Sequence, residues 1–518
     1  MSGVFERDAD ARILDALAVR TLPPRDHSSL PIYSSRTPIM TLVRGAPAPH
    51  LSRLLRGDPA APNASVRRRL RRSAPYLLAV LFFAAYGALS VTKHLQLRST
   101  GYDLGIFEQA VRAYAELRAP VSELKGEGYN LLGDHFHPIL ATLAPFYRLF
   151  PSPLTLLVAQ AALFAVSVVP VTRLAIRTTT PLLGAGIGIA YGLSWGLQKA
   201  VAFDFHEIAF AVPLLAFCLE RLARRQWRAA TAYALPLVLV KEDLPITVAA
   251  IGLYILLNGR RRLGAAVLSF GILAGLLIVL VLIPAFNPHG QYDYLSAATP
   301  GTGDPLVRLL LPSEKLETVI ALLAPTVFLA LRSPLVLLAL PTLAWRFWST
   351  NTAYWGQEFH YSAVLMPIVF TAFVDALSRL RERGRIQPPA LRHAGAVSVA
   401  VSVLMAPRLP LSDLAGPAWK PSPWAVPARE VMAAVPDGAR IGVINFLAPQ
   451  LTDRARVYQF PTVLDSGTKP DWLLVSVPAR GGIPVFPGEL PRLPELPALG
   501  YHLVMERRGI ELYRLTAG

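Results

Sequence analysis

A polar stretch between two apolar regions carries the residue types that acid–base chemistry needs. Residues 99–138 contain Asp103, Glu108, Asp134, His135 and His137. A carboxylate such as Asp103 can act as a general base that removes a proton from an acceptor hydroxyl. It can equally cap a helix by accepting hydrogen bonds from the first backbone amides. The sequence supports both roles for Asp103.

Four later loops gather further charged and histidine side chains: Asp204, His206 and Glu207; Lys241, Glu242 and Asp243; His289 and Asp293; Glu358 and His360. The compact ammonium of Lys241 suits a phosphate contact, and pairing among residues 241–243 is the structural alternative. Arg346 is a second phosphate candidate, with snorkelling to a membrane interface as its alternative. Glu358 and His360 are candidate sugar or phosphate contacts, although a solvated loop would look the same.

Two of these segments alternate carboxylate and imidazole in a way that can hold a metal. Asp134-His135-x-His137 and Asp204-x-His206-Glu207 each place side chains two residues apart, on one face of an extended strand. Mixed oxygen and nitrogen ligands bind divalent cations, and hydrogen bonding within the protein is the alternative. The sequence therefore leaves a divalent-metal site open and predicts no other cofactor with certainty.

The composition predicts a protein that crosses the lipid bilayer many times. Of 518 residues, 53% are hydrophobic and 16% are charged, whereas soluble domains carry about 25% charged residues. The formal net charge of +17 comes with Arg clusters of the kind that mark cytoplasmic loops, so no nucleic-acid partner is expected. The single Cys218 excludes an intrachain disulfide and a metal site built from cysteines.

Arg clusters also predict the orientation and the domains. RRRLRR (67–72) precedes the first expected span at 75–92, which places the N-terminus inside and residues 99–138 outside. With this span, the chain is expected to cross the membrane about eleven times and to end outside. We expect a disordered basic cytoplasmic tail at 1–74, a transmembrane helical bundle at 75–407, and a small extracytoplasmic α+β domain at 408–518.

Local patterns refine this mainly α architecture. Apolar residues at helical spacing from Leu104 to Leu117 predict an interfacial helix lying flat on the membrane, with Glu108 and Arg112 paired on its polar face. Residues 229–257 have basic flanks on both sides, which predicts a hairpin of two short helices with KEDLP at its tip. An amphipathic run (428–435) precedes five β-like runs, at 439–444, 455–460, 471–477, 501–506 and 510–515.

Five motifs occur in a characteristic order: YDLGIFEQ (102–109), NLLGDHFHPIL (130–140), FDFHE (203–207), LVKEDLP (239–245) and WGQEFHY (355–361). With them, the chain resembles the bacterial multipass membrane family called domain of unknown function 2079 (DUF2079), over roughly residues 75–480. That family in turn resembles the GT-C superfamily of membrane glycosyltransferases, which take sugars from polyprenyl-phosphate carriers. The resemblance implies a GT-C-like bundle, with Asp103 at the position of the catalytic base. The first loop lacks an adjacent Asp-x-Asp or Glu-x-Asp pair, which leaves metal dependence open.

The resulting hypothesis is a glycosyltransferase of the cytoplasmic membrane. Its donor would be a polyprenyl-phosphate-linked sugar, and its acceptor a glycan, lipid or protein of the cell envelope. Asp103 would be the base, and the expected substrate-binding residues are Glu108, Asp134, His135, Asp204, His206, Glu207, Lys241, Glu242, Asp243, Arg346, Glu358 and His360. A transporter or lipid flippase and a non-catalytic scaffold that presents the C-terminal domain are the alternatives.

Overall fold

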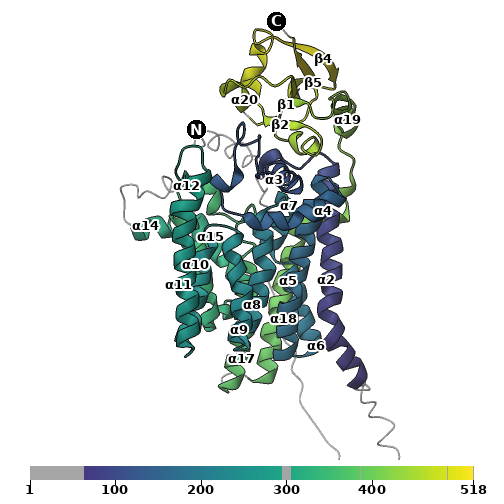
Figure 1. Cartoon of the computed structure of the whole chain (residues 1–518). Helices are drawn as coiled ribbons and strands as arrows, with labels where there is room; N and C mark the ends of the chain where they lie inside the picture. Colours follow the sequence, from purple (N-terminus) through teal and green to yellow (C-terminus); the bar gives the residue numbers. More distant parts are fainter. Residues whose placement is uncertain (1–63, 295–304, 385–386, 487, 517–518) are drawn as a thin grey trace, which may run out of the picture. The chain divides into compact units, whose positions relative to one another are not determined.

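The protein is mainly helical. The computed structural model describes residues 64–294, 305–384, 387–486 and 488–516, and within these ranges fourteen helices have seven or more residues (Figure 1). The α-helices are α2 (Ala64–Leu95), α3 (Ile106–Ala115), α4 (Ala144–Leu149), α5 (Pro153–Thr178), α6 (Pro181–Gly192), α7 (Trp195–Phe203), α8 (Ala211–Ala223), α9 (Trp227–Ala234), α10 (Leu244–Leu257), α11 (Arg261–Leu277), α12 (Ile283–Phe286), α14 (Pro305–Leu310), α15 (Ser313–Leu323), α16 (Leu340–Trp348), α17 (Leu365–Glu382), α18 (Pro388–Met405), α19 (Ala425–Ala433) and α20 (Thr462–Asp465).

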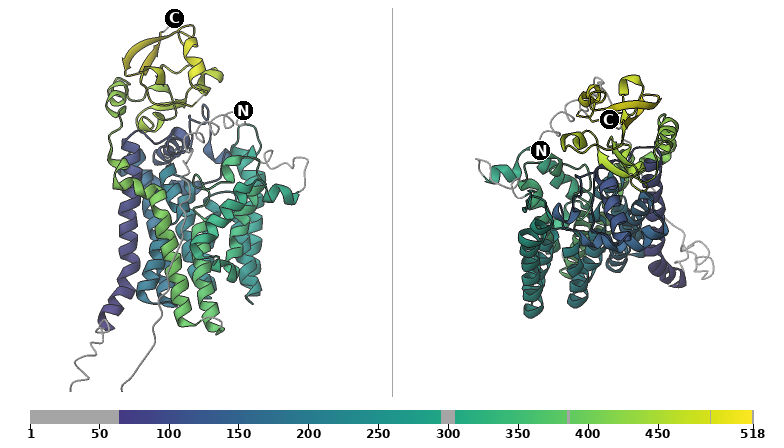
Figure 2. Two further views of the ribbon diagram at one scale, coloured as in Figure 1. Left: turned by 180° about the vertical axis from the view of Figure 1, so that it is seen from behind. Right: turned by 45° about the horizontal axis from the view of Figure 1, so that its top comes forward.

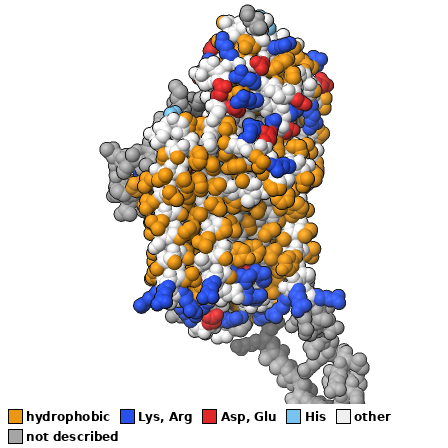
Figure 3. Space-filling view, viewed as in Figure 1, with side chains coloured by type: hydrophobic (Ala, Val, Ile, Leu, Met, Phe, Trp, Pro, Cys, Tyr) orange, Lys and Arg blue, Asp and Glu red, His pale blue; other side chains and the backbone are white. Residues whose placement is uncertain are grey.

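Four helical segments of the described chain are long and apolar enough to cross a membrane. They are Arg71–Leu95, Pro153–Thr178, Arg261–Phe286 and Pro389–Arg408. A span of the hydrocarbon core needs about 20 apolar residues. The space-filling view shows a broad hydrophobic band over these helices, bordered at one end by Lys and Arg side chains (Figure 3). The predicted class, a polytopic helical membrane protein, is confirmed.

The break predicted at KEDLP is present. Helix α9 ends at Ala234, a 3₁₀ turn covers Leu235–Leu239, and α10 starts only at Leu244, with Pro245 in its first turn. The charged residues before α10 therefore lie in a turn between helices. Helix α10 then packs so closely on α11 that a Cβ added to Gly252 would lie 2.3 Å from the backbone nitrogen of Leu268. Small residues permit such close approach of helices in a bilayer.

The C-terminal region forms a five-stranded mixed sheet, and all five predicted strands are present. The strands are β1 (Arg440–Val443), β2 (Arg456–Gln459), β3 (Trp472–Ser476), β4 (Tyr501–Arg507) and β5 (Ile510–Leu515), in the order β2-β1-β3-β5-β4. Strand β1 pairs in parallel with β2 and β3, and β5 pairs antiparallel with β3 and β4. Arg508 and Gly509 connect β4 to β5 with φ of 50° and 70°, as a two-residue hairpin turn requires.

The sheet shares a buried core with α3. Phe107, Ala110 and Val111 of α3 belong to the same apolar cluster as Ile441 and Val457 of the strands. Figure 1 and, from behind, Figure 2 show α3 next to the sheet domain. Helix α3 is present as expected, and the C-terminal domain contacts both its apolar residues and its polar Glu108 and Arg112. Its position on the membrane surface stays a prediction.

The predicted pair on α3 is wrong. Glu108 is fully buried at 0% exposure, and Arg112 pairs instead with Glu116 at 3.3 Å. Arg112 also donates to the backbone oxygens of Thr452 and Ala455. A helical repeat identifies the face that is apolar, but it cannot tell that a distant domain will bury the opposite face as well.

The predicted disordered tail extends too far into the chain. Residues 64–74 belong to α2, which continues without a break into the apolar span. Arg is a good helix former, so the basic run joins the helix that follows it. The remainder of the predicted tail, residues 1–63, lies outside the described residues.

Candidate functional site

Asp103 lies in a short π-helical turn, Gly101–Gly105, directly before α3. The N-cap of α3 is Gly105, without a side-chain cap, so the capping role for Asp103 is wrong. The Asp103 side chain is 25% exposed, and among the described residues its one charged contact is His206, with Nε2 3.9 Å from Oδ2. Burial raises the pKa of the Asp103 carboxyl above its usual range, and the nearby His206 offsets part of this rise. Asp103 is therefore a stronger base than an exposed aspartate.

His206 and His360 complete a compact group with Asp103. The two imidazole rings stack with centroids 3.4 Å apart, and one ligand atom from each of the three residues lies within 4.8 Å of the others. Both ring nitrogens of His360 are buried without a hydrogen-bond partner in the described part of the chain. Burial lowers the pKa of His360, so its ring is neutral and offers a lone pair. These three residues could hold a divalent cation.

This group differs from the metal ligands that the sequence pattern suggested. Of the two alternating segments, only His206 contributes to it, together with Asp103 and His360 from other parts of the chain. His137 is fully buried against Phe107, with ring centroids 5.5 Å apart, and its nitrogens have no hydrogen-bond partner among the described residues. Burial lowers the pKa of His137 to about 4. Hydrogen bonding within the protein, the alternative to a metal at this segment, is therefore absent for His137 among the described residues.

A buried ion-pair chain connects His206 to Lys241. Glu207 Oε2 lies 2.6 Å from His206 Nδ1, and Glu207 Oε1 lies 2.9 Å from Lys241 Nζ. Burial alone would raise the pKa of Glu207, but the neighbouring His206 and Lys241 lower it well below its usual range. Glu207 is therefore ionised. The predicted self-neutralising cluster at residues 241–243 is wrong, because the ion-pair partner of Lys241 comes from a different loop.

Glu242 holds a second loop beside the ion pairs of Lys241, Glu207 and His206. Its Oε1 lies 2.5 Å from His135 Nδ1 and accepts a hydrogen bond from Tyr292 at 2.9 Å. Its Oε2 accepts from the backbone N–H of Phe136 at 3.2 Å. With both oxygens bonded, Glu242 connects the turn before α10 to residues 135–136. Tyr292 reaches the same carboxylate from the loop that follows α12.

Asp134 extends this network. Its carboxylate pairs with Lys125 at 3.0 Å and accepts a hydrogen bond from Tyr294 at 3.3 Å. The Tyr294 ring also stacks on His135, with centroids 4.6 Å apart. Burial acts to raise the pKa of Asp134, yet Lys125 lowers it overall. Sequence reasoning missed Lys125 and Tyr294, since neither lies in a motif with regular spacing.

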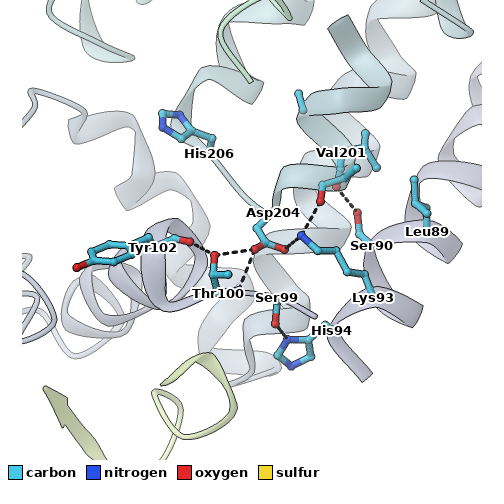
Figure 4. Close-up of polar contacts among 12 residues, drawn as sticks. Leu89, Ser90, Lys93, His94, Ser99, Thr100, Tyr102, Val201, Asp204 and His206 are labelled. Atoms are coloured by element: carbon cyan, nitrogen blue, oxygen red, sulfur yellow. Dashed lines mark hydrogen bonds and ion pairs between the residues drawn. The ribbon is translucent and has the colours of Figure 1, made fainter. Parts of the chain in front are cut away.

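Asp204 is part of a separate contact. Its carboxylate accepts hydrogen bonds from Lys93 Nζ at 2.8 Å and from the backbone N–H of Thr100 at 2.9 Å. Figure 4 shows Lys93 and Thr100 converging on Asp204, whereas His206 points away from it. Burial raises the pKa of Asp204 to about 6, against the opposing effect of Lys93. Asp204 thus fastens the end of α2 to the turn that carries His206.

Three other candidates each have a protein partner for at least one side-chain polar atom. Arg346 is fully buried and donates to the backbone oxygens of Tyr354 and Gly356, at 2.7 and 2.9 Å. Its predicted snorkelling to an interface is wrong. Asp243 accepts a hydrogen bond from Trp345 at 2.9 Å, and Glu358 pairs with Lys199 at 2.6 Å with its side chain 66% exposed.

Glu108 contacts the C-terminal domain rather than the Asp103 group. It accepts a hydrogen bond from Tyr147 at 2.7 Å, and another from Thr452. Burial raises the pKa of Glu108 to about 8. Its carboxylate therefore joins α3, α4 and the sheet domain.

Asn445, two residues after β1, holds the turn that carries Asp103. Its backbone oxygen accepts from Gly101 N–H at 2.8 Å, and its side-chain Oδ1 accepts from Tyr102 N–H at 2.9 Å. A Cβ at Gly101 would lie 2.9 Å from this Oδ1, so the close approach requires glycine. Glu489 accepts from the Asn445 N–H at 3.0 Å. Sequence reasoning missed Asn445, although it follows a predicted strand whose end is a common place for functional residues.

Comparison with known proteins gives a family and two similar structures. Crystal structures of ArnT from Cupriavidus metallidurans, bound to undecaprenyl phosphate and in the apo state, match with TM-scores of 0.49 and 0.47 at 16% and 15% identity. The matches cover 85% and 84% of this chain, and 98% and 97% of the ArnT chains. No curated protein matches. The model of a family described as predicted membrane protein (DUF2079) matches residues 93–512, and the chain therefore belongs to this family.

Proposed function

We propose that this protein is a GT-C-type glycosyltransferase, which transfers a sugar from a polyprenyl-phosphate donor to an acceptor of the cell envelope. One observation carries the proposal. The Asp103 carboxylate is partly exposed and has no hydrogen bond among the described residues, and it faces His206 at the end of the Lys241–Glu207–His206 chain. A base of raised pKa at one end of this chain and the ammonium of Lys241 at the other suit the transfer of a glycosyl group from a phosphate.

The proposed step is a direct displacement. Asp103 removes the proton of the acceptor hydroxyl, and the acceptor oxygen forms a bond to the anomeric carbon. The bond from that carbon to the phosphate oxygen breaks, and the phosphate leaves with the electron pair. The ammonium of Lys241 stabilises the negative charge of the phosphate, since a preorganised charge in a buried site costs no reorganisation during the reaction.

Other predicted residues then divide into two sets by their contacts. His135, Glu242 and Asp134 form the network beside the Lys241 chain and are the proposed sugar contacts. The remainder hold the elements of the site in place: Glu108, Asp204, Asp243, Arg346 and, through its pairing with Lys199, Glu358.

A divalent cation would be held by Asp103, His206 and His360. Its chemistry would be to neutralise the charge of the leaving phosphate. In our proposal, Lys241 supplies this charge and the Asp103 carboxylate stays available as the base. The proposed reaction therefore does not require a metal.

The proposed orientation follows from the Arg-rich end of the hydrophobic band (Figure 3). Positive charge marks the cytoplasmic end of spanning helices, which leaves the Asp103 group and the C-terminal domain on the extracytoplasmic face of the cell membrane. A lipid-linked sugar presented on that face would reach the Asp103 group from the bilayer.

The proposal is tested in liposomes that contain the purified full-length protein. The liposomes are given radiolabelled polyprenyl-phosphate sugars, with cell-envelope extract as the acceptor. Label should move to the acceptor with the wild-type protein. Movement of intact donor between leaflets without transfer would instead support a flippase, and absence of any transfer by folded protein with a full panel of donors would contradict the proposal.

A further inference from the structure

A cavity lies at the Arg-rich end of the helices, and none of its lining residues belongs to the Asp103 group. Its volume is about 600 Å³, within the range of small-ligand sites. The lining comes from the first turns of the span in α2 and from the last turns of α5: Arg71, Arg72, Pro75, Tyr76, Arg173, Ile176 and Arg177. Four arginines and a tyrosine therefore surround a space that opens where the hydrophobic band ends.

The positive charge around this cavity is poorly compensated. Among the described residues, Arg71, Arg72 and Arg177 form no ion pair, and Glu220 is the one carboxylate that pairs with Arg173 and Arg224. Clustered like charges repel one another at short range. Binding of an anion in the cavity would therefore relieve the repulsion among these arginines and stabilise the protein.

The contacts of Arg173 make the cavity a built site rather than a row of surface charges. Its Nε bonds to Glu220 at 2.7 Å, and its Nη2 bonds to the same carboxylate. This bidentate pair fixes the guanidinium plane at the cavity wall, where Nη1 has no hydrogen-bond partner among the described residues. Guanidinium groups match the geometry of phosphate oxygens.

The position of the cavity selects the kind of anion. Tyr76 is 59% exposed on the surface of a membrane-spanning helix. The four arginines lie in the end turns of the two apolar spans Arg71–Leu95 and Pro153–Thr178. Phospholipid headgroups occupy this depth in a bilayer. We propose that the cavity between α2 and α5 binds the phosphodiester headgroup of an anionic phospholipid from the leaflet at the Arg-rich end. The site is independent of the proposed sugar transfer.

The proposal is tested by native mass spectrometry of the full-length protein in detergent. The protein is titrated with dioleoyl-phosphatidylglycerol and, separately, with dioleoyl-phosphatidylcholine. The test variant is the double substitution Arg71→Gln/Arg177→Gln. The matched control is Arg261→Gln/Arg262→Gln, which removes two exposed arginines at the start of α11, outside the cavity.

The wild type should bind phosphatidylglycerol roughly tenfold more tightly than phosphatidylcholine, since each basic residue near a headgroup contributes to affinity. The Arg71→Gln/Arg177→Gln variant should lose this preference, and the control should keep it. Equal loss in both variants would overturn the proposal in favour of a general surface charge. Lack of preference in the wild type would overturn it even where the test variant failed to fold.

A third arm separates lipid from free phosphate. Soluble glycerol 3-phosphate is added to the complex with phosphatidylglycerol. Retention of the lipid at equal concentration is expected, because the acyl chains remain on the apolar surface below the cavity. Displacement of the lipid by glycerol 3-phosphate at equal concentration would overturn the assignment to a lipid headgroup.

Discussion

Asn445 accepts a hydrogen bond from the backbone N–H of Tyr102, the residue before Asp103, at 2.9 Å. A residue of the C-terminal sheet domain thus fixes the turn that carries the proposed base. A C-terminal domain that served only as a membrane anchor, or as a separate binding module, would not need this contact. The sheet domain is better understood as a part of the site.

Replacement of Asn445 should therefore slow sugar transfer without weakening donor binding. Asn445→Ala removes the acceptor for Tyr102 N–H but keeps the backbone bond to Gly101. Loss of a hydrogen bond costs about 1 kcal/mol, so kcat should fall about fivefold, with the KM for donor unchanged. Gln459→Ala is the control, because Gln459 bonds only locally to Phe460 among the described residues. Equal kcat values for both variants would contradict the role of Asn445 in positioning the turn that carries Asp103.

Glu108 should make the stability of the protein depend on pH. Burial raises its pKa from 4.5 to about 8 in the folded protein. Between these two values the unfolded chain releases the proton while the folded protein keeps it, so stability falls as pH rises through this window. Above both pKa values the destabilisation caused by Glu108 is constant, and below both values it is absent.

Glu108→Gln removes this titration. Thermal unfolding is measured in detergent from about pH 4 to about pH 9. The melting temperature of the variant, relative to that of the wild type, should increase by several degrees as the pH rises. The gain should level off above the folded pKa. A melting difference that stays constant across this range would show that the Glu108 carboxyl titrates normally.

Lys93 and Asp204 should be strongly coupled. They form a largely buried ion pair at 2.8 Å, and removal of one partner leaves an uncompensated charge, at a cost of about 3–5 kcal/mol. Lys93→Met and Asp204→Asn should each destabilise the protein, and the double variant should lose much less than their combined effect. The exposed Lys199–Glu358 pair serves as the control, with coupling of less than about 1 kcal/mol. Additive effects at Lys93 and Asp204 would contradict the burial of the pair.

Removal of metal ions by a chelator distinguishes the two roles that Asp103 can perform, general base and metal ligand. Because Lys241 supplies the charge at the phosphate in our proposal, EDTA should leave the transfer rate within about twofold. Metal analysis of the purified protein by mass spectrometry accompanies the assay. Loss of activity with EDTA that Mn²⁺ restores would make Asp103 a metal ligand in place of a base, and His360→Ala should then abolish the restoration.

Local sequence patterns predicted much of the fold. The alternating runs located all five strands, because each is short, apolar and bounded by turn residues. The charged turn before α10 was also predicted, since basic residues flank the apolar run on both sides. In each case the deciding information lay within about twenty residues of sequence.

The candidate site was predicted as a set of residues but not as a set of contacts. Pairing of Lys241 within its own loop was the alternative to a phosphate contact, yet its ion-pair partner is Glu207 from another loop. Glu108 was expected to pair with Arg112 on the polar face of its helix, yet it is buried, with Thr452 of a domain more than 300 residues away as a partner. Long-range pairing depends on how helices and the sheet domain pack together, which local spacing does not contain.

The most direct test of the account is the rate of sugar transfer by Asp103→Asn in liposomes, measured beside donor binding. The variant keeps the shape of the side chain and removes the base, so kcat should fall about 100-fold or more, while labelled donor binds with unchanged affinity. Asp437→Asn, at an exposed ion pair with Arg454 in the sheet domain, is the control and should transfer normally. Asp103→Asn protein that transfers sugar at the wild-type rate would contradict the assignment of Asp103 as the base.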